Sequence, residues 1–127
     1  QICYEGLFDW FSRESSLLGA QVLVNVTNDS WYGTWQQPYQ HLYMTLSRAI
    51  ETRLPIVRST NTGVSTVALA SGEVMQQSPL HVPWKGLYEI DYVKKPEPTI
   101  FVRFGYWFTD LFFVLWGALV VFYRNRT

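Results

Sequence analysis

The chain has 127 residues, of which 48% are apolar and 17% aromatic, enough for one domain, or part of one, with a sizeable core. Its ten basic and ten acidic residues cancel and form no basic cluster, which argues against nucleic acid as a partner. A single cysteine excludes an intrachain disulfide and a thiolate zinc cluster, and two well-separated histidines are a poor basis for a metal site, so we expect neither a metal nor a cofactor.

The chain starts at Gln1 and shows no signal-type leader. We interpret it as the C-terminal piece of a longer protein. A processed mature domain is the alternative.

The first predicted element is an amphipathic helix over residues 5–19, which Gly19 ends. Its expected buried and polar faces consist of Leu7, Trp10, Phe11, Leu17 and Leu18, and of Asp9, Ser12, Arg13 and Ser16, respectively. Residues 21–27 follow as a strand that starts with apolar residues on both faces, which is typical of a strand covered by a layer on each side. Residues 28–33 have the composition of a turn.

A second helix is predicted over residues 38–53, with Pro38 in its first turn. Its expected buried stripe consists of Leu42, Leu46, Ala49 and Ile50. Three strands are then predicted, the first two joined by a turn at 61–63, and they cover residues 55–60, 64–70 and 86–93. This order of helices and strands predicts a mixed α/β or α+β fold.

The segment 106–123 differs in kind, because it is long and apolar enough for a helix that crosses a bilayer. Asp110 lies one turn inside it, where a charge is costly unless it is near the interface or partnered. The ends carry aromatic residues suited to the interfaces and basic residues that mark the cytoplasmic side: Trp107, Tyr123, Arg124 and Arg126. A buried C-terminal core helix is the alternative, and we favour the membrane span.

Cys3 is the main candidate for chemistry. It lies at the start of the first helix, where helix N–H groups favour a thiolate and can hold an oxyanion. Glu5 could accept a proton there, or serve merely as a partner of the helix dipole. Spacing alone leaves a nucleophile and an inert buried thiol both open.

Other polar residues allow a functional and a structural interpretation. The loop at 28–33 is either a connecting turn or a binding wall built on its aromatic side chains. Arg48 and Glu51 are spaced for an ion pair on the second helix, at the surface or buried. His41 has no acid or thiol close to it in sequence, and we interpret it as a helix-surface or packing residue.

Several motifs in order resemble one known family. They are Cys3-Tyr4-Glu5, then "LVNVTNDSWYG", "QHLYMTLSRAIETRLPIVRSTNTGVS" and "VRFGYW" before an apolar end. Together they resemble the bacterial apolipoprotein N-acyltransferases of the nitrilase (carbon–nitrogen hydrolase) superfamily. The resemblance covers essentially the whole chain but about the last quarter of such a protein.

The resemblance implies a fold class and a location. The expected fold is α/β, the C-terminal part of a nitrilase-like αββα sandwich followed by a transmembrane helix. Residues 1–105 would form the C-terminal half of the catalytic domain, 106–123 the span and 124–127 a cytoplasmic tail. The catalytic domain would lie on the periplasmic side of the bacterial inner membrane.

The resemblance also implies roles for residues. Cys3 matches the nucleophile, the backbone N–H of Tyr4 would help to form the oxyanion hole, and Glu5 matches a further carboxylate of the active site. A substrate-binding loop is implied at Asn28, Asp29 and Trp31. The general-base Glu and the Lys of the family would lie upstream of Gln1, so we expect this piece alone to be inactive.

The implied reaction moves a fatty acyl chain from a membrane phospholipid, through a thioester on Cys3, to the N-terminal diacylglyceryl-cysteine of an apolipoprotein. The partners are therefore a phospholipid donor, an apolipoprotein acceptor and membrane lipids, and we expect a monomer. A nitrilase-type amidase and a non-catalytic membrane-anchored homologue are the alternatives.

Overall fold

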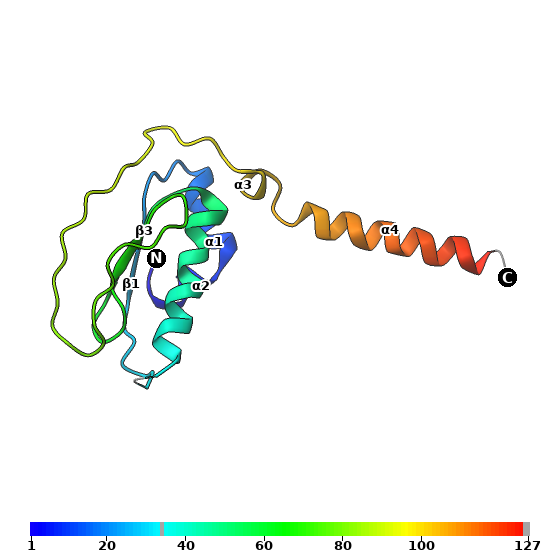
Figure 1. Cartoon of the computed structure of the whole chain (residues 1–127). Coiled ribbons are helices and arrows are strands. Elements are labelled where there is room, and N and C mark those ends of the chain that lie inside the picture. Colours follow the sequence, from blue (N-terminus) through cyan, green and yellow to red (C-terminus); the bar gives the residue numbers. More distant parts are fainter. Residues whose placement is uncertain (34, 126–127) are drawn as a thin grey trace.

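The computed structural model describes residues 1–33 and 35–125 (Figure 1). Its elements, in chain order, are the 3₁₀ helix η1 (Cys3–Leu7), α1 (Asp9–Leu17), β1 (Leu23–Thr27), α2 (Gln37–Thr52), β2 (Ile56–Thr60), β3 (Thr66–Ala68), α3 (Ile100–Phe104) and α4 (Trp107–Arg124). The mixed α/β class expected from the sequence is confirmed.

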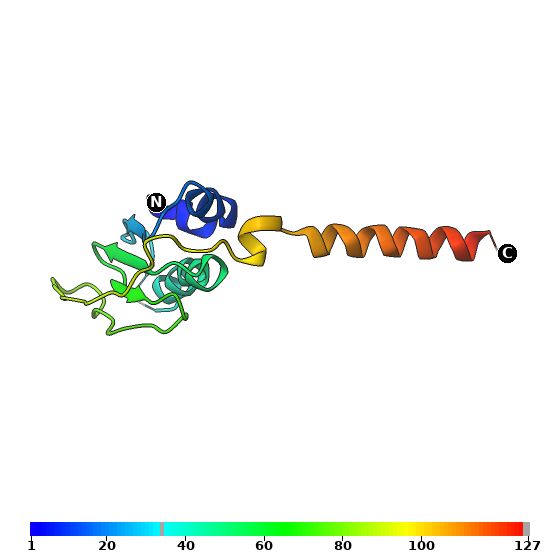
Figure 2. The ribbon, with the colours of Figure 1, turned by 90° about the horizontal axis from the view of Figure 1, so that it is seen from above.

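The described strands form one sheet in the order β1-β2-β3. β1 and β2 are parallel, with Leu23 opposite Ile56, and α2 is the crossover that a parallel pair requires. β2 and β3 are antiparallel and joined by a short turn, as predicted. Helices α1 and α2 lie next to each other on one side of this sheet, as Figure 2 shows when the molecule is seen from above.

The core lies between α2 and the sheet. The predicted stripe of α2 is confirmed at Leu42, Leu46 and Ala49, which are buried against β1 and β2. Full burial of each leucine stabilises the fold by roughly 1.5–3 kcal/mol. Ile50, expected in the same stripe, is 53% exposed, because it follows Ala49 on the helix and is turned by about 100° from it.

The first predicted helix is wrong in its start and its buried face. The chain forms η1, becomes extended at Phe8 and only then enters α1. Ser12 and Ser16 are buried, whereas Leu18 is 87% exposed and Trp10 is also exposed. The small serines allow close packing, and the Ser12 hydroxyl accepts a hydrogen bond of 2.6 Å from Gln1 Nε2. Helix α1 therefore packs through small polar side chains rather than through its large apolar ones.

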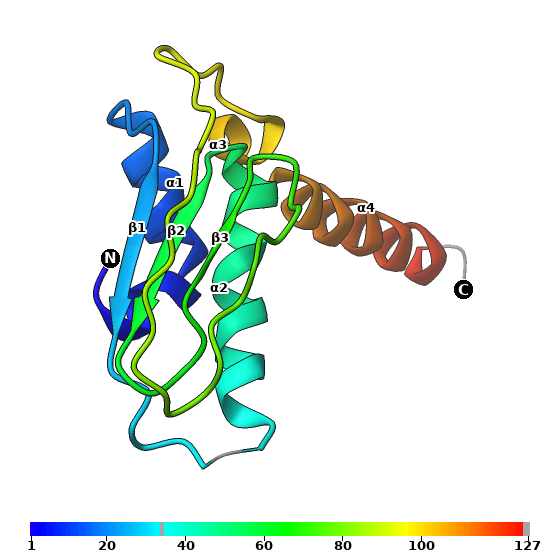
Figure 3. The same cartoon turned by 60° about the vertical axis from the view of Figure 1, so that its left-hand side comes forward.

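Two expectations for the sheet differ from the structure. β1 is covered on one face among the described residues, because Leu23, Asn25 and Thr27 are buried while Val24 and Val26 are exposed. The strand predicted at 86–93 is wrong, since this segment is an irregular stretch along the sheet (Figure 3). It has no backbone ladder within the described part of the chain, and its Leu87 is 98% exposed, so the alternation of side chains there has no neighbouring strand to fix it.

The C-terminal part leaves the domain through α3. Thr99 caps this helix, because its hydroxyl accepts from Val102 N at 3.0 Å and donates to Glu51 O at 2.6 Å. Val102 is completely buried, which attaches α3 to the domain. α4 then projects away from the domain as a separate rod (Figures 1 and 2).

Helix α4 matches the predicted apolar segment to within one residue at each end. Its 18 residues have a mean hydropathy of 1.4 and none of them is buried. By length and composition it is able to cross a membrane.

Candidate active site

Cys3 lies at a sharp change from extended chain to helix. The residues before it add to the edge of β1, because Ile2 bridges to Val26 and Val26 N donates to Gln1 O at 3.0 Å. Cys3 itself has φ +51° and opens η1. In α/β-hydrolase folds, a strained turn between a strand and a helix exposes the nucleophile to substrate. Such left-handed backbone costs about 1–3 kcal/mol for a residue other than glycine.

Two bonds close this turn. The Glu5 carboxylate accepts a hydrogen bond of 2.6 Å from the backbone N–H of Ile2. The Cys3 carbonyl accepts one of 3.1 Å from the side-chain amide of Asn25, which lies on β1. Cys3 and Glu5 are both half-buried. The candidate nucleophile and the nearby carboxylate therefore lie at the surface, on a turn that is bonded to β1 through Asn25.

Tyr4 connects this turn to the loop at 28–33. The Tyr32 hydroxyl donates to the Tyr4 hydroxyl at 2.5 Å, and both rings lie with their centroids 5.4 Å from that of His41. Burial, followed by the bond to Tyr4, raises the pKa of Tyr32. Tyr32 therefore stays protonated near neutral pH and remains a hydrogen-bond donor.

A buried charged network lies beneath the two tyrosines. Arg58 Nη2 donates to Asp29 Oδ2 at 2.9 Å and lies 3.1 Å from His41 Nδ1, while His41 Nδ1 lies 2.9 Å from Asp29 Oδ1. All three side chains are buried. Gly63 packs against this network so closely that a β-carbon there would overlap the carboxylate of Asp29. The network therefore fixes the loop after β1 to the start of α2 and to β2.

The ionisation of the network follows from its contacts. Burial opposes the charged form of Asp29, but the hydrogen bond to His41 and the charge of Arg58 outweigh it and hold the pKa of Asp29 below its ordinary 3.8. Burial lowers the pKa of the Arg58 guanidinium, and the charge of Asp29 opposes that shift. The pair remains ionised at neutral pH, as a buried and hydrogen-bonded ion pair does.

The predicted substrate-binding residues fall into two environments. Asp29 faces inward to Arg58 and His41. Asn28 is exposed and accepts bonds from Asn61 Nδ2 at 2.7 Å and from Ser30 N at 3.0 Å. Trp31 is 76% exposed. The structure thus places the loop next to Tyr4 through Tyr32, with the Trp31 side chain in solvent.

The pair Arg48 and Glu51 forms the ion pair that its spacing predicts, with Arg48 Nη2 at 2.6 Å from Glu51 Oε1. It is partly buried, because Arg48 Nη1 also donates to Leu7 O at 2.9 Å and so attaches α2 to η1. Burial raises the pKa of Glu51, and Arg48 opposes this shift. The role of the pair is structural.

Sequence reasoning missed Asn25 and Arg58, and for His41 it missed the bonding partners. Of the two alternatives for His41, a helix-surface and a packing residue, the packing one is confirmed, because His41 is buried and bonded inside the network. A signal was present for the other two, since Asn25 and Arg58 occupy inward positions of strands whose neighbouring inward residues include Leu23 and Ile56. A charged side chain on a buried strand face requires a partner of opposite charge, and Asp29 was available two residues after β1 ends.

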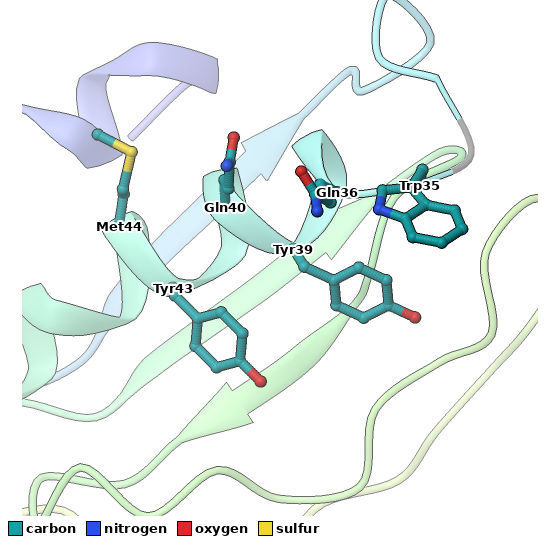
Figure 4. A pocket seen from close by; sticks show the side chains of 6 residues that line it. All are labelled: Trp35, Gln36, Tyr39, Gln40, Tyr43 and Met44. Atoms are coloured by element: carbon teal, nitrogen blue, oxygen red, sulfur yellow. The ribbon is translucent and has the colours of Figure 1, made fainter.

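Two hollows adjoin this region. One, of about 270 Å³, is lined by Tyr4, Leu7, Tyr32, Gln37, Gln40, His41 and Met44. The second is an open groove of about 830 Å³ along the outer side of α2, lined by Trp35, Gln36, Tyr39, Gln40, Tyr43 and Met44. Figure 4 shows Tyr39 and Tyr43 one turn apart on the same side of α2, with Trp35 at its N-terminal end. The two hollows share Gln40 and Met44 as lining residues, so a continuous surface runs from Tyr4 along α2.

The described residues include no group of side chains suited to bind a metal ion. Among residues 1–33 and 35–125, no set of three His, Cys, Asp or Glu side chains is placed to hold an ion.

Comparison with known proteins relates the chain to one enzyme family. It is 55% identical over 120 residues to the apolipoprotein N-acyltransferase of Bdellovibrio bacteriovorus, covering 94% of this chain and 22% of that protein. It is 43% identical over 79 residues to that of Geobacter metallireducens, covering 62% and 15%. The chain thus spans about a fifth of the length of these curated relatives.

A solved structure and a family model also match part of the chain. An amidase of the nitrilase superfamily from Nesterenkonia AN1 aligns with 63% of this chain and 32% of its own, with a TM-score of 0.49 and 18% identity. Residues 1–84, which include η1, the three strands, α1 and α2, match the model of the carbon–nitrogen hydrolases. This match covers well over half of the sequence, and the chain belongs to the carbon–nitrogen hydrolase family.

Proposed function

We propose that this chain is the C-terminal part of an apolipoprotein N-acyltransferase, with Cys3 as its nucleophile. The observation that carries the proposal is the turn at Cys3, where a half-buried thiol stands on left-handed backbone between an extended segment and η1. Cys3, Tyr4 and Glu5 lie within residues 1–84, which match the carbon–nitrogen hydrolase model, and 94% of the chain aligns with a relative that bears this name.

The proposed reaction has two steps. The Cys3 thiolate adds to an ester carbonyl of a phospholipid, a C–S bond forms, the ester C–O bond breaks, and the lysophospholipid oxygen leaves with a proton. The α-amino group of a diacylglyceryl-cysteine then adds to the thioester, a C–N bond forms, the C–S bond breaks and the amine loses a proton. Covalent catalysis of this kind divides one difficult transfer into two easier ones.

The residues of the site have separate tasks in this scheme. The Tyr4 N–H stabilises the oxyanion that develops in each step. Glu5 closes the Cys3 turn through its bond to Ile2 N and supplies a carboxylate beside the nucleophile. Asn28 and Trp31 are exposed beside the site and contact substrate, while the buried Asp29 holds their loop in place. The general base and a lysine are assigned to segments outside this chain, and no residue here replaces them.

Helix α4 supplies the proposed location. Residues 1–105 form part of a periplasmic catalytic domain, 106–123 span the inner membrane and 124–127 lie in the cytoplasm. Both substrates carry acyl chains, so a site attached to the bilayer reaches them without extracting either into water. The exposed and apolar character of α4 supports this arrangement.

The alternative within the family is an amidase that hydrolyses a small C–N substrate. The family name favours it, but a small soluble substrate gives no reason for an apolar helix of 18 residues without a buried position. A non-catalytic homologue is the third possibility, and the same experiment separates all three.

The test is the intact mass of the full-length protein that carries this chain, in detergent, after incubation with phosphatidylethanolamine. We expect a gain of one fatty-acyl group at Cys3, removed by hydroxylamine and absent from Cys3→Ser. Addition of a diacylglyceryl-cysteine peptide is then expected to discharge the thioester and to add the acyl mass to the peptide. A folded wild-type protein that gains no acyl mass would rule out the acyltransferase, and turnover of a small amide by it would establish the amidase.

A further inference from the structure

The carbonyl of Cys3 is bonded to a side chain whose orientation is set from inside the sheet. Asn25 Nδ2 donates to Cys3 O at 3.1 Å, and Arg58 Nη1 donates to Asn25 Oδ1 at 2.6 Å. A guanidinium has donors and no acceptor, so the amide oxygen of Asn25 must face Arg58 and its NH₂ must face Cys3. Both side chains are buried, so water does not compete for these bonds.

Arg58 is itself fixed. Its second nitrogen is bound to Asp29 at 2.9 Å, and Nη1 also donates to Thr45 Oγ1 at 3.0 Å. Asn25 and Arg58 are direct partners in the parallel register of β1 and β2. The chain of bonds from Asp29 to Cys3 therefore stands on two paired strands, which hold a site more rigidly than loops do.

The Cys3 carbonyl and the Tyr4 N–H belong to one peptide group. This group is planar, and none of the peptide bonds in the described part of the chain is cis, so the C=O and the N–H point in opposite directions. A carbonyl that points at Asn25 consequently turns the Tyr4 N–H away from the sheet. The left-handed backbone of Cys3 is disfavoured by itself, so this orientation needs an external contact to keep it.

We propose that Asn25 and Arg58 are positioning residues for acyl transfer, which aim the Tyr4 N–H at the oxyanion. When the Cys3 thiolate adds to the substrate carbonyl, the C–S bond forms and the C=O electron pair moves to oxygen, where the Tyr4 N–H donates to it. When the intermediate collapses, the C=O bond forms again and the ester C–O bond breaks. Neither Asn25 nor Arg58 touches substrate. The inference rests on the proposed function in assigning Cys3 as an acylated nucleophile.

The sharpest variant is Asn25→Asp in the full-length protein. The carboxylate has the shape of the amide and still accepts from Arg58, so the buried pair and the fold are retained. It cannot donate to Cys3 O and places an acceptor against that carbonyl, which turns the peptide. Loss of one oxyanion-hole donor costs about 10²–10³-fold in rate, so we expect acylation by phosphatidylethanolamine at saturation to fall by about 10²-fold. Asn25→Ala, which adds no charge, is expected to fall in the same direction.

Two measurements distinguish positioning from general damage. Alkylation of Cys3 by iodoacetamide forms a C–S bond without an oxyanion, so we expect its limiting rate at high pH to change by no more than about threefold. Half-saturation by phospholipid is expected to stay within about twofold, because ground-state binding is unchanged. The matched control is Ser78→Ala, which removes a buried hydroxyl that accepts from Ser65 N at 2.9 Å. This change weakens the fold at a residue with no bond to Cys3, Asn25 or Arg58, and the variant should acylate at the wild-type rate.

The outcomes separate this inference from the proposed function. If wild-type protein takes no acyl group from phospholipid, the proposed function fails, and the inference is tested on acylation of Cys3 by p-nitrophenyl acetate, which also forms an oxyanion. Wild-type rates in folded Asn25→Asp and Asn25→Ala would overturn the inference. So would a parallel loss of acylation and alkylation, which would mean that Asn25 supports the whole turn, and so would a wild-type Cys3 that reacts with neither ester.

Discussion

Asp29 carries a charge that is neutralised wholly inside the protein, by Arg58 and by the bond to His41. Removal of one partner of a buried ion pair leaves the other charge uncompensated and costs roughly 3–5 kcal/mol. The folded state lowers the pKa of Asp29 below 3.8. The ionised form therefore stabilises the fold above the unfolded pKa, and this contribution is lost as pH falls through the folded value.

The resulting prediction concerns Asp29→Asn. At pH 7 we expect this variant to lower the free energy of unfolding by roughly 3–5 kcal/mol. We expect the difference from wild type to shrink below about pH 4, because the carboxyl of the unfolded wild type takes up a proton there while that of the folded protein stays ionised to lower pH. Thermal unfolding of the full-length protein in detergent between pH 3 and pH 7 measures it. Glu97→Gln is the control, since Glu97 pairs with Arg103 at the surface, and it should show no such dependence. A difference that stays constant down to pH 3 would contradict the assignment.

Glu51 contributes to the pH dependence of stability with the opposite sign to Asp29. Burial raises the pKa of Glu51, so its contribution to stability is present below the unfolded pKa and decreases as pH rises through the folded one. Acidification therefore removes stability at Asp29 and adds some at Glu51. The comparison with Asp29→Asn cancels the Glu51 contribution, because Glu51 is common to both proteins.

The residues of the site show which information the sequence carries. Cys3 and Glu5 became candidates because their types and their place before a helix allow chemistry, and the family resemblance favoured them; their roles stay predictions. Asn25, His41 and Arg58 did not become candidates, because their role depends on the register of β1 with β2 and on the crossover of α2, which bring together positions 33 and 17 residues apart. A polar residue inside an apolar strand signals that a partner exists but does not say which residue it is.

At the scale of elements, α2 was predicted well and α1 was not, for one physical reason. The apolar stripe of α2 packs on a sheet within the chain, so its period and its burial agree. The apolar residues of α1 have no described surface to cover them, and the helix packs through Ser12 and Ser16 instead. The alternation at 86–93 failed similarly, because a strand pattern becomes a strand only beside another strand.

The two sides of α2 give the second prediction. Leu42 is completely buried and Ile50 is about half exposed, so Leu42→Ala should cost roughly 2–5 kcal/mol through lost contacts and a cavity. Ile50→Ala should cost about 1 kcal/mol or less. Denaturant unfolding of the full-length protein measures both values. An equally large loss for Ile50→Ala would show that the outer side of α2 is covered in the complete protein.

At the scale of the whole molecule, the domain and α4 present opposite surfaces to their surroundings. The domain buries apolar residues between α2 and the sheet. Helix α4 stands apart from the domain (Figure 2), and none of its side chains is buried. In water such a rod would aggregate, because exposed apolar patches of this size are rare on monomeric proteins. In the proposed membrane span, lipid would cover this surface.

The last prediction tests α4 as a span. Residues 106–124, placed as a segment in a host protein whose glycosylation reports insertion, are expected to insert. Leu115→Arg, near the middle of the helix, should reduce the inserted fraction strongly, because an arginine at the centre of a span costs about 2.5–3.5 kcal/mol in such insertion measurements. Asp110→Leu is the matched substitution near the N-terminal end and should leave insertion nearly unchanged, since an end position allows the carboxylate to reach the interface. Equal insertion of wild type and Leu115→Arg would mean that the segment does not cross the membrane centre. A large gain in insertion for Asp110→Leu would place Asp110 in the hydrocarbon region, where it would need a partner from another helix.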